Sequence, residues 1–184
     1  MIPDWLAGAP RPQRPAGWRP AKVYTVSMSG KSYCHALAEK PWAITTHYVE
    51  TQPGTQRTVV CQGKACVCGG AAAINRRWVG FLPVVDSSLN NPGIMQISRK
   101  ADEKLDVIRL QHGSIKAVRL AFYRVPRKGH KARRNDEVTV EMDGPGVADH
   151  LLPATFDVRP TVLLMFGFSA AEIDAMLGIA FDRG

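Results

Sequence analysis

Three cysteines and a histidine in one short segment constrain this chain more than any other feature. Their spacing is His47-x13-Cys61-x4-Cys66-x-Cys68. Thiolate sulfur and imidazole nitrogen are preferred donors of tetrahedral structural zinc, for which three Cys and one His are a common ligand set. The segment from Gly63 to Gly70 is rich in glycine, which lets a backbone fold closely around an ion. The spacing therefore predicts one zinc ion held by these four side chains.

Three further considerations bear on this site. Cys34 and His35 compete with His47 for the fourth ligand position, because zinc accepts all of these donors. Lys64 places a positive charge near the thiols and favours their ionised, metal-binding form. The alternative, three ordinary buried cysteines, is disfavoured because clustered cysteines beside glycines in a hydrophilic loop rarely pack as core. A catalytic zinc requires an open position and a nearby general base, and no His-Glu pair accompanies the cysteines, so we expect a structural site.

The remainder of the chain alternates short apolar segments with turns. β-branched and aromatic residues predict strands over residues 23–28, 42–49, 57–60, 76–85, 94–97, 118–125 and 138–142. Strands at this density favour a small β-barrel or curved sheet over a parallel α/β fold. We therefore expect a mainly β (α+β) protein.

Two helices are expected among these strands. Ser98 predicts the start of a helix that runs to about residue 111, with Ala101, Leu105 and Ile108 on one face. Near the C-terminus, Ser169 and Glu172 form a capping-box pattern for a helix to about residue 181. The apolar face of this second helix serves either core packing or docking to another protein.

The expected organisation has three parts. Residues 1–21 contain five prolines with interspersed arginines and predict an extended basic arm. Residues 22–160 are expected to form the main domain, with the zinc-binding segment inserted at about 42–72. Residues 161–184 are expected to form a C-terminal strand and helix, which belongs to the core or docks to a partner.

The net charge of +8 predicts a polyanionic partner. Positive charge is concentrated between two expected strands, in a segment that carries Arg124, Arg127, Lys128, Lys131, Arg133 and Arg134. Like charges at this density repel one another, and a bound phosphate backbone explains them more readily than solubility alone. Arg76, Arg77 and Trp78 form a second basic and aromatic cluster directly after the cysteines. The rings of Trp78 and Tyr123 could stack on bases, and the alternative for each ring is packing in the core.

The sequence resembles the zinc-containing single-stranded-DNA-binding proteins of T-even phages, and shorter proteins of phage and plasmid origin. The matching elements are His47, Cys61, Cys66 and Cys68, followed by the segment 76–86. The resemblance covers roughly residues 42–145. It implies an oligonucleotide/oligosaccharide-binding (OB) barrel with an inserted zinc subdomain and one structural zinc. The cysteine spacing is shorter here, and the sequence ends without an acidic tail, so tail-mediated recruitment of repair partners is not expected.

The leading hypothesis is a non-catalytic, mostly sequence-independent binder of single-stranded DNA, with RNA as the second possibility. An accessory subunit of a larger nucleoprotein complex, RNA-guided or acting in replication or recombination, is the alternative. A zinc-dependent hydrolase or nuclease is a third hypothesis, for which Asp86, Asp102, Glu103 and Asp106 are the available carboxylates. These four lack metal-site spacing, and a solvated surface explains them.

The sequence also bears on the compartment. It contains no apolar run near the length of a transmembrane helix. Its first residues do not have the pattern of a signal peptide. We therefore expect a cytoplasmic protein, bacterial or encoded by a phage or plasmid, with its four cysteines in the reduced state.

Overall fold

The fold is described from a computed structural model over residues 19–52, 55–61, 66, 76–116, 118–126, 130–133 and 136–177. The described residues form two compact units. The sheet unit consists of Ala21–Ala43 and Val79–Val158. The hairpin unit consists of the described residues of Met1–Pro20, Ile44–Trp78 and Arg159–Gly184. The expected arm at residues 1–21 lies outside the described residues except for its last three positions.

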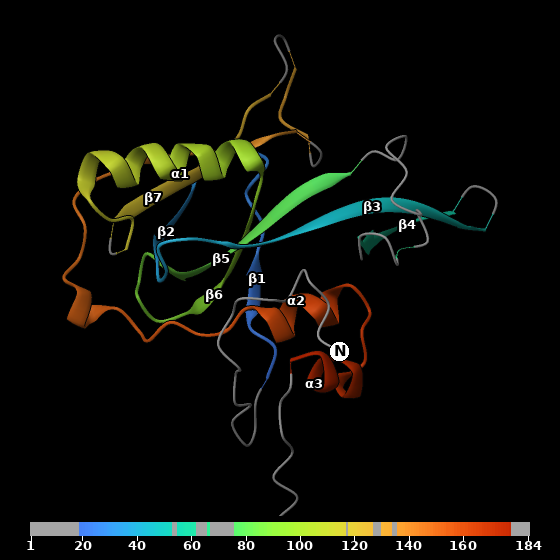
Figure 1. Ribbon diagram of the computed structural model, residues 1–184. Coiled ribbons are helices and arrows are strands. Elements are labelled where there is room, and N and C mark those ends of the chain that lie inside the picture. Colours follow the sequence, from blue (N-terminus) through green and yellow to red (C-terminus); the bar gives the residue numbers. More distant parts are fainter. Residues whose placement is uncertain are drawn as a thin grey trace, which may run out of the picture. The chain divides into compact units, whose positions relative to one another are not determined.

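Six strands of the sheet are neighbours in the order β1-β6-β5-β2-β7-β8 (Figure 1). Their bounds are β1 Lys22–Tyr24, β2 Ser32–Ala36, β5 Arg77–Asp86, β6 Pro92–Ile97, β7 Arg119–Arg124 and β8 Val138–Met142. β1 runs parallel to β6, and the other neighbours in this order are antiparallel. Two further strands, β3 (Trp42–Gln52) and β4 (Thr55–Val60), form an antiparallel hairpin, and β3 also pairs with β5.

The prediction of a mainly β protein is confirmed. The described residues contain eight strands in one mixed sheet and three α-helices. Among the described strands the sheet is open, so a barrel closed by hydrogen bonds is not observed. None of the helices described is long and apolar enough to span a membrane.

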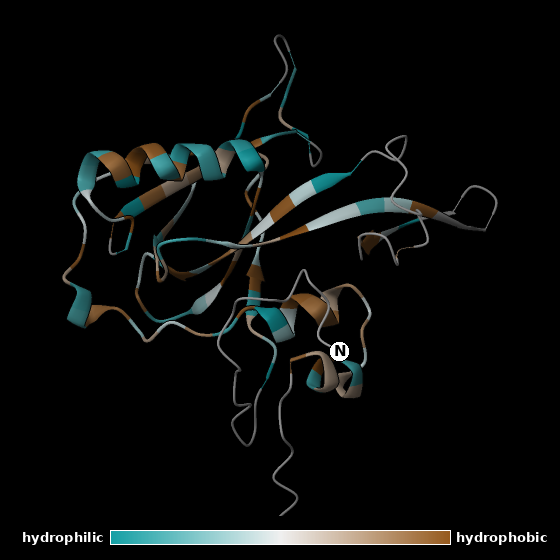
Figure 2. Ribbon diagram, viewed as in Figure 1, coloured by the Kyte–Doolittle hydropathy of each residue, from teal (hydrophilic) through white to brown (hydrophobic). Residues whose placement is uncertain are grey.

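Helix α1 (Arg99–His112) begins and ends where the sequence predicts. The Ser98 hydroxyl accepts a hydrogen bond from the Ala101 amide, and Gly113 ends the helix in the left-handed conformation at φ 78°. Figure 2 shows hydrophobic and hydrophilic residues alternating along α1. Ala101, Leu105 and Ile108 are buried as expected, and α1 packs against β8.

The core of the sheet unit includes side chains from its central strands. β5 is buried along most of its length, and Phe81, Leu82, Val84 and Val85 have no exposed surface. On β7, Leu120 and Phe122 are fully buried and point to one face of the sheet. The same face of β2 carries Cys34, which is opposite Leu120 in the register.

Two elements differ from the sequence predictions. β2 was not expected, although it lies between β5 and β7 at the centre of the sheet. The apolar segment expected to form a C-terminal strand is instead helix α2 (Arg159–Met165). Helix α3 (Ala170–Leu177) follows, and its capping box is confirmed because Ser169 and Glu172 exchange hydrogen bonds between side chain and backbone. The predicted end of this helix, beyond residue 177, lies outside the described residues.

Candidate metal centre and nucleic-acid interface

The β3–β4 hairpin places His47 and Cys61 on one face. His47 is opposite Val59 in the register, and the amide of Cys61 donates to the carbonyl of Thr45 at 2.8 Å. Positions two residues apart along a strand share a face, so His47 and Cys61 are diagonal neighbours across the hairpin. The chain then leaves the hairpin and returns at Cys66.

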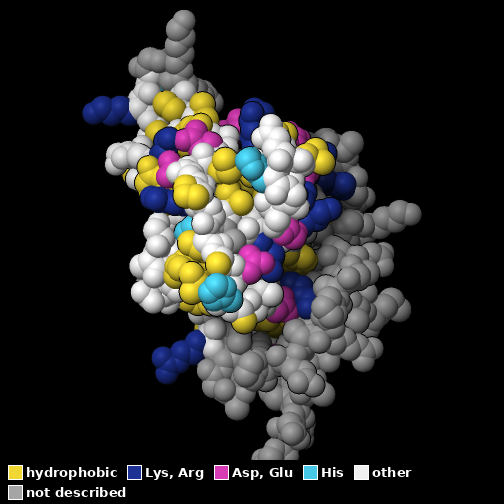
Figure 3. Space-filling view, turned by 90° about the vertical axis from the view of Figure 1, so that its left-hand side faces the viewer, with side chains coloured by type: hydrophobic (Ala, Val, Ile, Leu, Met, Phe, Trp, Pro, Cys, Tyr) yellow, Lys and Arg dark blue, Asp and Glu magenta, His cyan; other side chains and the backbone are white. Residues whose placement is uncertain are grey.

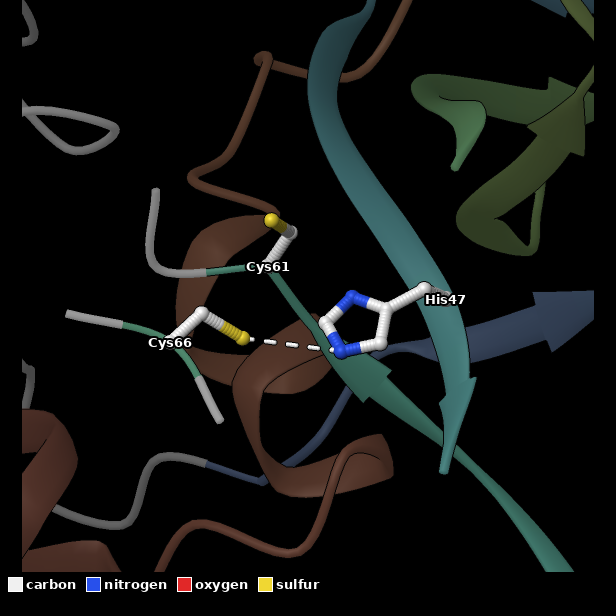
Figure 4. Close-up of side chains that lie close together, drawn as sticks. All are labelled: His47, Cys61 and Cys66. Atoms are coloured by element: carbon white, nitrogen blue, oxygen red, sulfur yellow. Dashed lines mark hydrogen bonds between the residues drawn. The ribbon is translucent and has the colours of Figure 1, made fainter. Parts of the chain in front are cut away.

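The three side chains converge (Figure 4). Nε2 of His47 lies 3.5 Å from Sγ of Cys66. The ligand atoms of His47, Cys61 and Cys66 all lie within 4.8 Å of one another. An ion bonded tetrahedrally to an imidazole nitrogen and a thiolate, at the usual zinc bond lengths, separates the two donor atoms by about 3.6 Å. The spacing of the three donors therefore suits a tetrahedral metal ion.

Burial supports the same interpretation. His47 is 1% exposed, Cys61 7% and Cys66 9%. Nδ1 of His47 is buried and has no hydrogen-bond partner among the described residues. Buried polar atoms nearly always have a partner, so an imidazole enclosed beside two thiols with one unpaired nitrogen is an unfavourable arrangement. An ion bound at Nε2 would leave Nδ1 unpaired, so the fit depends on the donors themselves: two buried thiols and the Nε2 nitrogen are a set that fits one metal ion. Cys68, the remaining predicted ligand, lies outside the described residues.

The competing ligands occupy a different position. Cys34 and His35 lie on β2 of the sheet unit, 2% and 3% exposed. Burial raises the pKa of the Cys34 thiol to about 12, which keeps it protonated and disfavours metal binding. The group that forms in the structure contains His47, the first choice from the sequence.

The basic segment connects β7 to β8. Its described cations Lys131 and Arg133 are exposed. Arg127, Lys128 and Arg134 lie outside the described residues. The end of the loop is fixed, because the Arg133 amide donates to the Asp136 carboxylate at 2.7 Å and the Asp136 amide donates back to the carbonyl of Arg133 at 3.0 Å. The loop therefore holds at least two cations toward solvent.

Arg124 lies at the base of this loop, and its side chain holds two backbone segments together, a role that the sequence did not indicate. Its guanidinium donates to the carbonyl of Val26 at 3.3 Å and to the carbonyl of Asp136 at 2.9 Å. These bonds join the end of β7 to the end of the loop and to the segment after β1. Its charge still adds to the local potential.

The second basic and aromatic cluster lies at the start of β5. Arg76 and Arg77 are exposed, and Trp78 is half-buried. Lys64 lies outside the described residues. Tyr123 is half-buried on β7. One side of the molecule shows hydrophobic, basic and acidic side chains interspersed (Figure 3), so that side is not a uniform basic surface.

The carboxylates considered for catalysis are used in other ways. Partial burial acts to raise the pKa of Asp86, but hydrogen bonds from Asn91, Ser88 and backbone amides lower it to about 2. These bonds shape the turn between β5 and β6. On α1, Glu103 pairs with Arg99 and Asp106 pairs with Arg109. Desolvation raises the pKa of Asp102. The cluster of possible metal ligands found among the described residues contains none of these four.

Sequence reasoning did not single out Lys31, Tyr33 or Arg119. Lys31 lies beside the ring of Tyr123, and Arg119 lies beside the ring of Tyr33 on β2. Tyr33 is 39% exposed although its strand is central. No sequence signal marked it, because the last three residues of β2 are all buried and the strand shows no alternation.

No protein family, curated protein or solved structure gives a match to this chain.

Proposed function

We propose that this protein is a non-catalytic single-stranded nucleic-acid-binding protein with an OB-like sheet and one structural zinc. The observation that carries the proposal is the cationic loop between β7 and β8, which extends from a mainly β scaffold and exposes Lys131 and Arg133. Single-strand binding requires cations for the phosphates and a sheet surface for the bases. DNA is the preferred ligand and RNA the second.

The strand order supports the OB-like part of the proposal. In an OB barrel the first strand pairs with the second and the fourth, and the loops after the first and fourth strands flank the ligand. Here β2 pairs with β5 and β7, β5 pairs with β6, and β7 pairs with β8. The segment after β2 contains the candidate metal ligands, and the segment after β7 is the basic loop. Both therefore have the sequence positions of ligand-flanking loops.

Contacts beside the open edge also support it. The Ser98 hydroxyl, directly after β6, donates to the carbonyl of Val138 in β8 at 2.8 Å. Lys100, in the first turn of α1, forms an ion pair at 2.8 Å with Glu137, which directly precedes β8. Side chains thus connect the end of β6 to the start of β8, the two strands whose pairing would close an OB barrel.

Zinc is the metal we propose, because two thiols and an imidazole within 4.8 Å form a nitrogen and sulfur donor set. Cys68 would complete a set of four. The ion would hold the hairpin unit in shape and would take no part in chemistry. Its thiolates require a reducing compartment, for which we propose the cytoplasm. The resemblance to zinc-containing phage single-strand binders remains part of this proposal.

Fluorescence anisotropy with labelled oligo(dT), oligo(U) and a duplex of the same length tests the function. We expect tighter binding to the single strands at modest salt. Each phosphate contact to a single strand contributes about 0.7 to the slope of log K against log salt. Replacing Lys131 and Arg133 with Ala should therefore lower the slope by about 1.4. Replacing Arg99 and Lys104, two exposed cations on α1, is the control and should leave the slope unchanged. Equal affinity for duplex and single strands, or no binding, rejects the proposal.

A further inference from the structure

Two tyrosines lie on one face of the sheet unit, where Tyr33 is 39% exposed and Tyr123 is half-buried. Tyr33 of β2 is opposite Ala121 of β7, and Tyr123 is two residues beyond Ala121. The side chains of Tyr33, Ala121 and Tyr123 therefore point to the same face. Tyr33 and Tyr123 are diagonal neighbours, with Cα atoms about 7–8 Å apart by ordinary strand geometry. The buried residues Cys34, Leu120 and Phe122 point to the opposite face.

Each of these tyrosine rings has a cation beside it. The guanidinium of Arg119 lies 4.9 Å from the ring centroid of Tyr33. Nζ of Lys31 lies 5.5 Å from the ring centroid of Tyr123. Such contacts orient an aromatic ring and lower the entropy lost when a second group stacks on it. We refer to Lys31, Tyr33, Arg119 and Tyr123 as the tyrosine face.

The charges of the tyrosine face are largely balanced. Lys31 forms an ion pair with Glu141, which also accepts a hydrogen bond from Tyr123, and Nε of Arg119 lies 3.5 Å from the carboxylate of Asp143. Phosphate attraction on this face is therefore weak. Exposed cations lie in the next segment of the chain, where Lys131 and Arg133 belong to the loop that follows Tyr123.

We propose that the tyrosine face stacks bases of a single strand whose phosphates are held by the adjoining basic loop. This inference rests on the proposed function and gives it a stacking site. A flat, near-neutral pair of rings beside a cationic loop matches the two parts of a nucleotide, an apolar base and a charged phosphate. A polyanion without bases could bind the cations of the loop, but it has no group that would stack on the tyrosine rings.

The test compares Tyr33→Leu and Tyr33→Phe, with the same pair at Tyr123, in anisotropy titrations with oligo(dT). Loss of one stacking ring should weaken binding by about 5- to 100-fold, while Phe retains the ring and should bind like the wild type. The salt slope should stay unchanged in all four variants, because no phosphate contact is removed. Leu110→Ala, at a residue 86% exposed on α1, is the control for surface substitution.

An abasic strand of the same length separates stacking from charge. The wild type and Tyr33→Leu should bind it equally. If the wild type binds oligo(dT) and the Leu variants bind it equally well, the tyrosine face is not the stacking site and the proposed function stands. If the wild type binds no single strand, the proposed function itself fails and this inference fails with it. Circular dichroism of each variant verifies that the exposed substitutions leave the fold intact.

Discussion

Nε2 of His47 lies 3.5 Å from Sγ of Cys66, although nineteen positions separate the two residues in the chain. The hairpin carries His47 in the middle of β3, and the chain returns to it after β4. Together with Cys61 the two residues form a group of donors that could hold a metal ion.

The purified protein should contain one zinc ion per chain. His47→Ala, Cys61→Ser and Cys66→Ser should each reduce the bound zinc, because a site with three ligands in place of four loses affinity and exposes the ion to water. Elemental analysis after dialysis measures this. Cys34→Ala is the matched control, since it removes a buried thiol of the sheet unit and should leave the zinc content at one. Full zinc occupancy in the His47→Ala protein would exclude His47 as a ligand.

Ser98 has two separate roles at the start of α1. Its hydroxyl accepts from the Ala101 amide at 3.2 Å and donates to the carbonyl of Val138 at 2.8 Å. Ser98→Ala removes both bonds and should lower the free energy of unfolding by about 1–2 kcal/mol. Urea denaturation measures the change. Ser98→Thr retains the hydroxyl and should lose less, and equal losses in the two variants would show that the hydroxyl is not responsible.

The pKa of Asp86 makes part of the stability dependent on pH. The pKa in the folded state is about 2, below the value of about 3.9 in an unfolded chain. The stabilisation is therefore complete above the unfolded pKa and is lost as the pH falls toward the folded one. Asp86→Asn should destabilise the protein at pH 7, and its difference from the wild type should shrink as the pH is lowered from about 5 to about 2. A difference that stays constant in denaturation curves over this range contradicts the assignment. Asp149→Asn is the exposed control.

Gly113 and Gly167 test a contact in the hairpin unit. Both have positive φ, 78° and 85°, so an Ala at either position should cost about 1–2 kcal/mol from backbone strain. At Gly113 an added Cβ would meet open space, but at Gly167 it would overlap Nη2 of Arg57. That guanidinium nitrogen donates to the carbonyl of Phe166 at 3.4 Å. Arg57 is exposed and its guanidinium is the far end of a flexible side chain, so it can move aside. Gly167→Ala should therefore cost about as much as Gly113→Ala in thermal denaturation.

The Arg57→Ala background provides the control for this comparison. The cost of Gly167→Ala should be the same in this background as in the wild type, because the backbone strain is its main cause. A clearly smaller cost in the Arg57→Ala background would show that the guanidinium resists displacement.

Helix α1 could be predicted closely because three independent signals agree. Ser98 caps its start, Gly113 ends it, and Ala101, Leu105 and Ile108 repeat at helical spacing. The three donors of the metal group were also predicted, from residue type and spacing alone. The pairing that brings His47 and Cys61 to one face depends on the strand register, which the spacing does not determine.

β2 and α2 could not be predicted for physical reasons. The β2 sequence Ser-Tyr-Cys-His-Ala has no β-branched residue, and pairing with β5 and β7 on both sides makes it a strand. The apolar run from Val162 to Phe166 suits a buried strand or a buried helix equally well. Pro160, in the first turn of α2, was the one local signal for a helix.

The interruption of the sheet unit by the hairpin unit affects the order in which the chain can fold. β2 and β5 are neighbours, yet everything from Leu37 to Arg76 lies between them in the sequence. Bringing such distant ends together is entropically costly and slows folding. If the β3–β4 hairpin forms first around the proposed zinc ion, the loop that remains to be closed is effectively shorter. A shortage of zinc during synthesis would then delay assembly of the central sheet, even though His47, Cys61 and Cys66 all belong to the hairpin unit.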